Sequence, residues 1–372
     1  MGGTVRDLLW GLEPKDLDLV MPRPVLGPAR ALADRLGASY VLLDESYEIA
    51  RLIMPDALQL DLAACLGATL EDDLRRRDFT LNALARRLRN GELVDPTGGL
   101  EDLEQRILRP TSPAVFPEDP LRLLRAVRFL ACHPLRPSED LDGLLQEHHE
   151  LLRQVSPERI QDELAFILRA GMTSQLARLK STGLYAVLFP AQPSSELLER
   201  LEADDLAWLG DEAPAVRAWL DQPLSATRER RLSLALAALG GSPWLSSRAE
   251  ERYQQRVLEL APLALGLTAD RGERFRWFRR AGSEAVDACV LAHQMDPRPQ
   301  LAELVGSYLA QDLVACPALP VDGADLMRAL QLKPGPEVGR LLDELGALAA
   351  QEGVLTRERA LEEAARLVQA SG

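Results

Sequence analysis

Long hydrophobic runs, paired cysteines and clustered histidines are all missing from this 372-residue sequence. No apolar run approaches the roughly 18–20 residues that a membrane-spanning helix needs, and the first residues show no signal-peptide pattern. The four cysteines form no CxxC pair, and the four histidines form no HExxH motif. We therefore expect no membrane association, no disulfide framework and no zinc site, and a reducing cytoplasm fits this composition.

Lysine is also scarce: only three of the 43 basic residues are lysines, and the other forty are arginines. The net charge of −14 argues against a nucleic-acid binder, because a phosphate backbone attracts a basic surface. Arginine, however, offers a planar fork of donors for phosphates and base edges. Genomic base composition explains the arginine content equally well, so composition alone leaves RNA binding open.

The pattern of apolar residues changes about one third of the way along the chain. Strand and helix signals alternate over residues 1–110, whereas amphipathic helices broken by proline and glycine follow from about residue 112. We expect an α+β head and an all-helical remainder, divided as 1–111, 112–170 and 171–372. The periodicity predicts helices over 5–10, 26–36 and 71–89, strands over 16–20, 40–43, 49–54 and 58–62, and a turn and strand over 91–95.

Two carboxylates alternate along the first predicted strand. Asp16 and Asp18 share one face of it, because side chains two residues apart on a strand point the same way. Carboxylates held in this way can bridge a pair of Mg²⁺ ions, and Asp61 on a neighbouring strand is a candidate third carboxylate. A solvated strand face is the alternative interpretation of each aspartate.

A glycine pair precedes this strand. Gly2 and Gly3 stand before a predicted helix, whose free N–H groups suit an anion, and Arg6 adds a cation for a triphosphate. A glycine turn, a helix and a DxD strand within 17 residues are the arrangement expected of a nucleotidyltransferase.

Five motifs in order resemble those of the class II tRNA nucleotidyltransferases and bacterial poly(A) polymerases, within the polymerase-β-like superfamily. The motifs are Gly2–Asp7 with Asp16-x-Asp18, Arg76–Ala83, Asp95–Gly99 with Asp102-Leu103 and Leu108-Arg109, Glu118–Phe129, and Glu158–Leu164. The resemblance implies a small mixed-sheet catalytic head, a helical neck that recognises the nucleobase, and a helical body and tail that bind tRNA. It covers about 165 residues closely.

The second motif implies ribose recognition. Asp78 and Asn82 are predicted on one helix face, four residues apart, where together they can bond ribose hydroxyls. Arg76 and Arg77 are candidates to hold phosphate or to support the carboxylates. The alternative is a surface arginine cluster with a capping aspartate.

The fourth motif implies base reading without a template. Asp119 and Arg122 are expected on one helix, where the carboxylate can accept from the exocyclic amino group of C or A and the guanidinium can donate to the ring. An intrahelical salt bridge is the alternative. Glu118 and Arg125 are expected to orient this pair, and Arg125 and Arg128 complete the nucleotide-binding candidates. We also expect Asp95, Gly98 and Gly99 to form a hinge. Glu158 and Arg159 are expected to have structural roles.

Two departures from the family pattern stand out. No strand precedes the glycine pair, so we expect the sheet to lack a strand beside the DxD strand. Only twelve residues, 62–73, separate Asp61 from the Leu74–Asp78 segment, where members that add the terminal A carry a longer flexible loop. The short segment favours an enzyme that adds only two C residues.

Arginines and aromatics interleave over residues 271–280 in the predicted body. This pattern is typical of a helix that binds an RNA backbone and stacks on an exposed base. The alternative is a helix that buries Phe275 and Phe278 and exposes its arginines to solvent. The candidate RNA-binding residues are Arg271, Arg274, Arg276 and Arg279.

The sequence thus predicts a Mg²⁺-dependent enzyme that transfers CMP from CTP to the 3′ end of tRNA and releases pyrophosphate. A separate A-adding enzyme would complete the product. The protein of this sequence would bind the 3′ end, the acceptor and the elbow of the tRNA. A complete CCA-adding enzyme that also uses ATP, a poly(A) polymerase, and a non-catalytic RNA-binding relic remain as alternatives.

Overall fold

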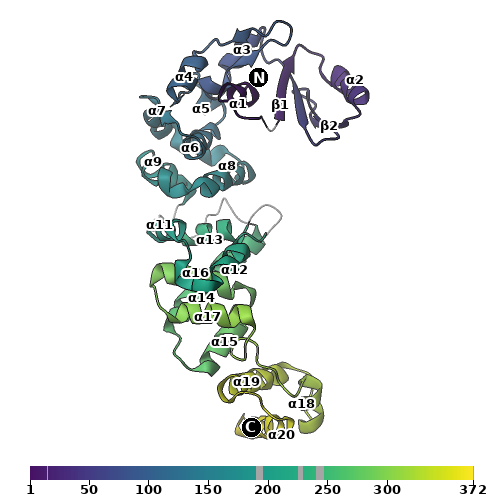
Figure 1. The fold of residues 1–372 in the computed structure, drawn as a ribbon, viewed down its shortest axis with the longest axis vertical. Helices are drawn as coiled ribbons and strands as arrows, with labels where there is room; N and C mark the ends of the chain where they lie inside the picture. The colour runs from purple at the N-terminus through teal and green to yellow at the C-terminus, as the bar shows by residue number, and fades with distance from the viewer. Residues whose placement is uncertain (15, 190–195, 225–228, 240–246, 372) are drawn as a thin grey trace. The chain divides into compact units, whose positions relative to one another are not determined.

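The computed structural model describes residues 1–14, 16–189, 196–224, 229–239 and 247–371. The chain divides into two units, Met1–Leu188 and Phe189–Gly372, each with its own hydrophobic core (Figure 1). The first unit carries the sheets and the second is helical, so the expected mixed head with a helical remainder is confirmed. The boundaries expected at residues 111 and 170 both fall inside the first unit and stay predictions.

A four-stranded sheet with the order β1-β4-β3-β2 forms the outer part of the first unit (Figure 1). Its strands are β1 (Asp16–Met21), β2 (Ser39–Asp44), β3 (Ile49–Ile53) and β4 (Gln59–Ala64). β1 pairs with β4 in parallel, whereas the β2–β3 and β3–β4 pairs are antiparallel. β1 forms one edge of this sheet, and the Met1 amino group donates to the Asp18 carbonyl on that edge.

Helix α2 (Leu26–Leu36) covers one face of this sheet (Figure 1). Its small residues Ala29 and Ala33 are buried against Leu52 and Leu62 of the strands. Small side chains let a helix lie close to a sheet, and alternation along each strand sends every second residue to the opposite face. The polar residues of β1 and β4 therefore lie on the face that α2 leaves uncovered.

Short elements follow the sheet and complete the first unit. They are α1 (Gly3–Leu9), α3 (Leu70–Arg75), η1 (Thr80–Asn82), β5 (Ala85–Arg86), β6 (Leu93–Val94), α4 (Gly99–Gln105), β7 (Ile107–Leu108), α5 (Val115–Glu118), α6 (Arg122–Cys132), β8 (Arg136–Pro137), α7 (Leu141–His148), η2 (His149–Gln154), α8 (Pro157–Ala170), η3 (Met172–Gln175), α9 (Leu176–Ser181) and α10 (Leu184–Leu188). Helix α6 packs along α8 in this part of the unit.

The helix expected over residues 71–89 is wrong, because α3 ends at Arg75. The backbone beyond it pairs with the segment before α5: Thr80 N–H donates to the Arg109 carbonyl at 2.9 Å, and Thr111 N–H donates to the Asp78 carbonyl at 3.2 Å. Phe79 is fully buried at this junction. Burial and these backbone bonds outweigh the helical periodicity, which is a weak preference by comparison.

The second unit consists of helices among its described residues. They are α11 (Glu196–Ala203), η4 (Ala207–Glu212), α12 (Ala213–Leu220), α13 (Arg230–Ala238), α14 (Arg248–Gly266), α15 (Arg271–Ala281), η5 (Gly282–Glu284), α16 (Ala285–Met295), α17 (Gln300–Ala310), α18 (Gly323–Leu330), α19 (Pro336–Glu352) and α20 (Arg357–Ser371). No helix in the described part of the chain is long and apolar enough to span a bilayer. All four cysteines are free thiols.

A buried ion pair lies at the centre of the second unit. Asp287 on α16 has no exposed surface and accepts from Arg230 at 2.8 Å, from Tyr253 at 2.8 Å and from Trp219 at 3.1 Å. Burial raises the pKa of Asp287, and the three donors oppose that rise. The hydrogen bonds of this carboxylate therefore connect α16 to α12, α13 and α14.

Replacing Asp287 with alanine should destabilise the second unit strongly. The change leaves Arg230 buried without its partner, which costs about 3–5 kcal/mol for buried pairs. Urea unfolding followed by tryptophan fluorescence measures the loss. The matched control is Asp343→Ala, which removes an exposed partner of Arg279 and should cost less than about 1 kcal/mol. Equal losses in the two variants would contradict this account.

Candidate active site

Asp16 and Asp18 lie on the sheet face that α2 leaves open. The Thr4 hydroxyl accepts the Asp18 N–H at 2.8 Å and lies 3.3 Å from the Asp18 carboxylate, so α1 holds the strand in place. Burial and the neighbouring Asp16 raise the pKa of Asp18. Two like charges at a half-buried site repel each other, and a bound cation would offset that repulsion.

Asp61 stands one strand further along the same face, directly opposite Asp18 in the β1–β4 register. Its two carboxylate oxygens accept from Arg51 Nε and Nη2, both at 2.8 Å. The Asp61 carboxylate thus forms a bidentate ion pair with the Arg51 guanidinium on β3. Within the described ranges, no three histidine, cysteine or acidic side chains form a metal-binding group, and the role of Asp61 as a third carboxylate stays a prediction.

Gly2 lies between the Arg77 guanidinium and the Asp18 carboxylate. Gly2 has a φ of 60°, and a Cβ there would lie 2.9 Å from Arg77 Nη1 and 3.8 Å from the Asp18 carboxylate. A side chain at Gly2 would therefore displace the guanidinium, whereas Gly3 starts the seven-residue helix α1.

Arg6 is held within the protein. Its guanidinium donates to Asp7 at 2.7 Å and to Asn82 at 2.7 Å, and it lies over the rings of Trp10 and Phe129. Only 11% of its side chain is exposed. Arg6 thus ties α1 to η1 and α6, and its role toward a triphosphate stays a prediction.

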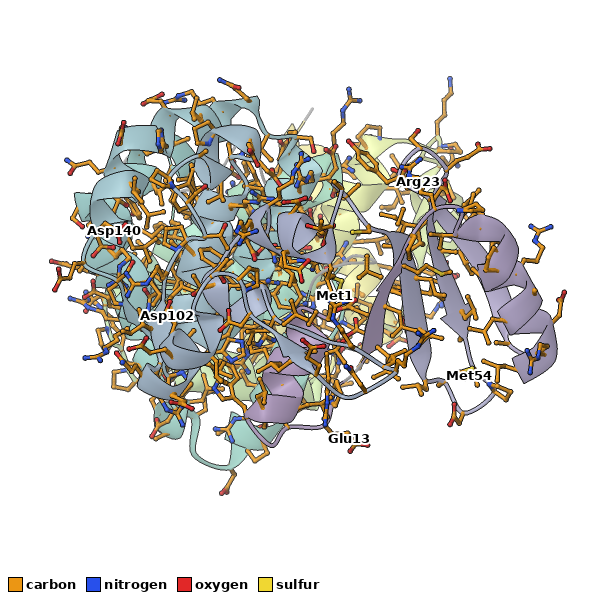
Figure 2. All side chains as sticks on the ribbon, turned by 90° about the horizontal axis from the view of Figure 1, so that it is seen from above. Met1, Glu13, Arg23, Met54, Asp102 and Asp140 are labelled. Atoms are coloured by element: carbon orange, nitrogen blue, oxygen red, sulfur yellow. The ribbon has the colours of Figure 1, made fainter. Side chains whose placement is uncertain are left out.

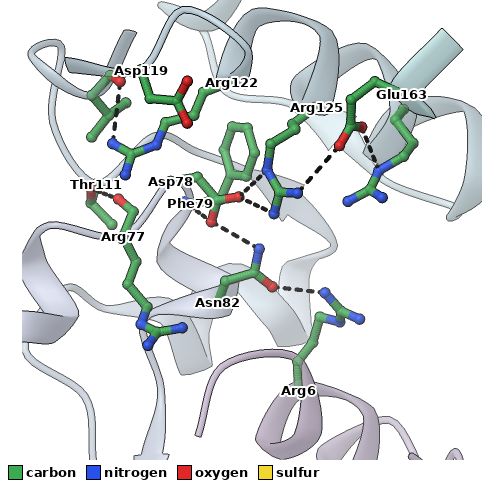
Figure 3. A network of polar contacts seen from close by, with 12 residues as sticks. Arg6, Arg77, Asp78, Phe79, Asn82, Thr111, Asp119, Arg122, Arg125 and Glu163 are labelled. Atoms are coloured by element: carbon green, nitrogen blue, oxygen red, sulfur yellow. Dashed lines mark hydrogen bonds and ion pairs between the residues drawn. The ribbon is translucent and has the colours of Figure 1, made fainter. Parts of the chain in front are cut away.

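A chain of hydrogen bonds and ion pairs runs from Arg6 on α1 through Asn82 on η1 to α6 and α8 (Figure 3). Asp78 is its centre: one oxygen accepts from Phe79 N–H at 2.8 Å and Asn82 at 3.0 Å, and the other accepts twice from Arg125, at 2.9 and 2.7 Å. Burial acts to raise the pKa of Asp78, but Arg125 and the other donors outweigh it and hold the pKa below its ordinary value. Asp78 and Asn82 are in contact, but their expected placement on one helix face is wrong, because Asp78 precedes η1. Their expected role toward a ribose stays a prediction.

Glu163 on α8 ends this chain. It lies 3.4 Å from Arg125 and 3.0 Å from Arg128, and it is buried. Arg128 also lies over the rings of Phe129 and Phe166. Arg128 therefore braces α6 against α8, and its expected contact with a nucleotide stays a prediction.

A cavity of about 330 Å³ opens beside Asp78. Its lining consists of Leu66, Asp73, Arg76, Arg77, Asp78, Asp119, Leu121, Arg122, Arg125 and Arg159. Five of these ten residues are arginines, so the cavity suits a phosphorylated ligand. The lining includes Arg159, which sequence reasoning assigned a structural role only.

Asp119 and Arg122 both face this cavity, but they do not share a helix. Asp119 is extended, because the residue before a proline disfavours the helical region, and α6 begins at Arg122. The Asp119 carboxylate accepts from Arg159 at 2.9 Å, whereas Arg122 donates to the Arg76 carbonyl at 3.0 Å. The expected placement on one helix is wrong, and the structure does not contain the alternative intrahelical salt bridge between them.

Family models match two parts of the chain. The model described as "Poly A polymerase head domain" matches residues 44–109, and "Probable RNA and SrmB-binding site of polymerase A" matches residues 137–195. A CC-adding tRNA nucleotidyltransferase of Geobacter sulfurreducens is 32% identical, over 97% of this chain and 89% of the relative. The chain belongs to the tRNA nucleotidyltransferase family.

Two further proteins are similar to this chain, one in sequence and one in fold. A CC-adding tRNA nucleotidyltransferase of Deinococcus radiodurans is 33% identical to this tRNA nucleotidyltransferase, over 94% of this chain and 83% of the relative. The solved structure of a Thermotoga maritima CCA-adding enzyme, complexed with tRNA, aligns with a TM-score of 0.71 over 99% of this chain and 90% of that chain. At 22% identity, that alignment establishes the likeness of fold.

Three arginines of α15 pair with acidic side chains of neighbouring segments. Arg274 pairs with Glu303 at 3.0 Å, Arg276 with Glu344 at 3.3 Å and Arg279 with Asp343 at 3.0 Å. Phe275, Trp277 and Phe278 are buried, which confirms the core interpretation of the aromatic residues and leaves them unable to stack on a base. RNA binding by Arg271, Arg274, Arg276 and Arg279 stays a prediction.

The segment expected to act as a hinge in this tRNA nucleotidyltransferase is tightly tied. Asp95 accepts from the N–H groups of Thr97, Gly99 and Leu100, at 2.8–3.2 Å. A Cβ on Gly99 would lie 2.0 Å from the Thr80 carbonyl oxygen. Helix α4 therefore presses on η1, the element that carries Asn82, and a hinge role stays a prediction.

Gly99→Ala should displace η1 and loosen the Asp78 network. The added methyl overlaps the Thr80 carbonyl, and overpacking of this kind costs about 1–3 kcal/mol. We expect a lower unfolding free energy together with slower nucleotidyl transfer. The control is Gly143→Ala on α7, where a Cβ meets open space, so stability should hold or rise slightly. Unchanged transfer and stability in Gly99→Ala would contradict the contact.

Proposed function

We propose that this tRNA nucleotidyltransferase adds two CMP residues from CTP to the 3′ end of tRNA, without a template, and then stops. The names of the Geobacter and Deinococcus relatives, each a CC-adding tRNA nucleotidyltransferase, support this proposal. We place the reaction in the cytoplasm, where a separate A-adding enzyme would complete the product.

The observation that carries the proposal is the short connection between β4 and α3. Only residues 65–69 lie between the two elements. Leu66 N–H donates to the Asp73 carboxylate at 2.8 Å, and Thr69 and Asp72 close the connection in a capping box. Because Leu66 and Asp73 also line the cavity, this tied connection supports a cavity of one shape, suited to one base.

We assign base reading to Asp119 and Arg122. A carboxylate offers about four acceptor positions and a guanidinium five N–H groups, so each side chain keeps capacity beyond its contacts with Arg159 and Arg76. Cytosine presents an amino donor to the carboxylate and two acceptors, O2 and N3, to the guanidinium. Uracil presents a carbonyl in place of the amino group and leaves the carboxylate unmatched, which penalises it.

We propose that Arg76 and Arg77 bind the phosphates of the nucleotide. Asp78 and Asn82 hold Arg125 in its orientation. The pairing of Asp16 and Asp18 on one strand face, with the raised pKa of Asp18, fits a divalent cation. We propose Mg²⁺, held by Asp16 and Asp18, with Asp61 as the third carboxylate. Bound Mg²⁺ lowers the pKa of an attacking hydroxyl and stabilises a leaving pyrophosphate.

The test is incorporation into a tRNA that lacks its 3′ CCA, with CTP alone, ATP alone, or both, resolved to single nucleotides. We expect two added C residues with CTP, no addition with ATP alone, and no further addition when both are present. The Asp16→Asn variant controls for contaminating activity and should be inactive. Addition of a terminal A would contradict the two-C limit, and no incorporation by the unaltered chain would contradict the proposed transfer.

A further inference from the structure

The open face of the sheet continues beyond the carboxylates. In the register of the four strands, Asp18 is followed by Asp61, Arg51 and Val41 in one row across the sheet. In the next row, Ile53 follows Asp16 and Gln59. These rows share one face, because paired residues of adjacent strands point the same way.

The candidate nucleotide cavity lies on the β1 side of this row. All of its lining residues come from the chain after β4, and its Arg77 lies across Gly2 from Asp18 at the β1 edge. In Figure 1, β1 lies toward the helices of the first unit and β2 lies on the far side of the sheet. Figure 2 shows the same arrangement, with Met1 between the helices and the sheet, and Met54, just past β3, beyond it. A second substrate that meets the nucleotide at Asp18 therefore has the β3–β2 side of the face left to lie on.

The β3–β2 side combines exposed apolar side chains with a guanidinium. Val41 is 38% exposed and Ile53 is 37% exposed, whereas Ala50 and Leu52 on the opposite face of β3 are buried under α2. Arg51 keeps a third of its side chain exposed beside them, and it neutralises Asp61. Apolar side chains can pack against bases and riboses, and a guanidinium can contact a phosphate.

We propose that Val41, Arg51 and Ile53 form a platform for the last nucleotides of the RNA acceptor, those just before the reacting 3′ hydroxyl. Three strand spacings of about 4.8 Å separate Asp18 from Val41, so Val41 lies about 14 Å from the carboxylates. That distance places the platform under nucleotides that precede the terminal one. The proposal rests on the proposed transfer to an RNA 3′ end and deepens it by naming where that end lies.

The test compares Val41→Glu with Leu42→Glu. The two residues are neighbours on β2 with similar exposure, 38% and 47%, but they point to opposite faces of the sheet. A carboxylate at Val41 would repel RNA phosphates, so we expect the KM for a tRNA lacking CCA to rise about tenfold, with the KM for CTP within about twofold. Leu42→Glu should leave both constants within about twofold of the unaltered enzyme.

A second measurement uses the unaltered protein. A tRNA that lacks CCA and carries 4-thiouridine at its 3′ terminus is irradiated in the complex, before and after addition of CTP. We expect the cross-linked peptide to fall within residues 39–53 after C addition, when the labelled nucleotide has moved back from the reacting end.

The outcomes separate this inference from the proposed function. Failure of the unaltered enzyme to incorporate C would contradict the function itself. Normal incorporation with equal KM values for tRNA in the two variants, or cross-links only outside residues 39–53, would overturn the platform. A change of oligomeric state in both variants, measured by light scattering, would instead make the β2 edge a contact between copies and would also overturn it.

Discussion

The buried contact between Asp78 and Arg125 is the interaction on which the first unit depends. It joins the segment that follows the sheet to α6, and Arg125 continues the connection to Glu163 on α8. Removing charges from water is costly, and the cost is recovered only where every charge has a close, well-oriented partner. Asp78 meets that condition with four donors, two of them from one guanidinium.

This constraint places the rest of the site. With Arg125 fixed, α6 starts beside the cavity, and Asp119 and Arg122 at its entry face the same space as Arg76 and Arg77. Asn82 carries the contact on to Arg6, and hence to α1, whose Thr4 holds the carboxylate strand. The carboxylates and the cavity therefore share one network of polar contacts, while the short β4–α3 connection closes the cavity from the sheet side.

The sequence was a good guide where the determinants are local. Alternation placed residues 16–20 on a strand, and the second, fourth and fifth motifs contain eight of the ten residues that line the cavity. It failed where distant segments compete. The periodic run over 71–89 breaks at Arg75, because the backbone of Asp78 and Thr80 pairs with residues 109–111. No local pattern announces that pairing.

Two other differences have distinct causes. The extended Asp119 was visible in principle, since Pro120 follows it and disfavours a helix there. Arg159 lies 40 residues from its partner Asp119, so only the packing of α8 beside α6 brings it to the cavity. The engagement of Arg6 with Asn82 spans 76 residues and depends on the fold in the same way. The motifs thus predicted which residues are candidates for the site, whereas they did not predict which residues these side chains contact.

A double-mutant cycle on Asp78→Asn and Arg125→Met tests the central claim most directly. The unfolding free energy and the KM for CTP are measured for the unaltered protein, both single variants and the double variant. If the buried pair organises the unit, each single change raises the KM, and the two stability losses couple by about 1–3 kcal/mol. Losses that add within about 0.5 kcal/mol, with an unchanged KM in the single variants, would show that the two residues act independently and would contradict the account.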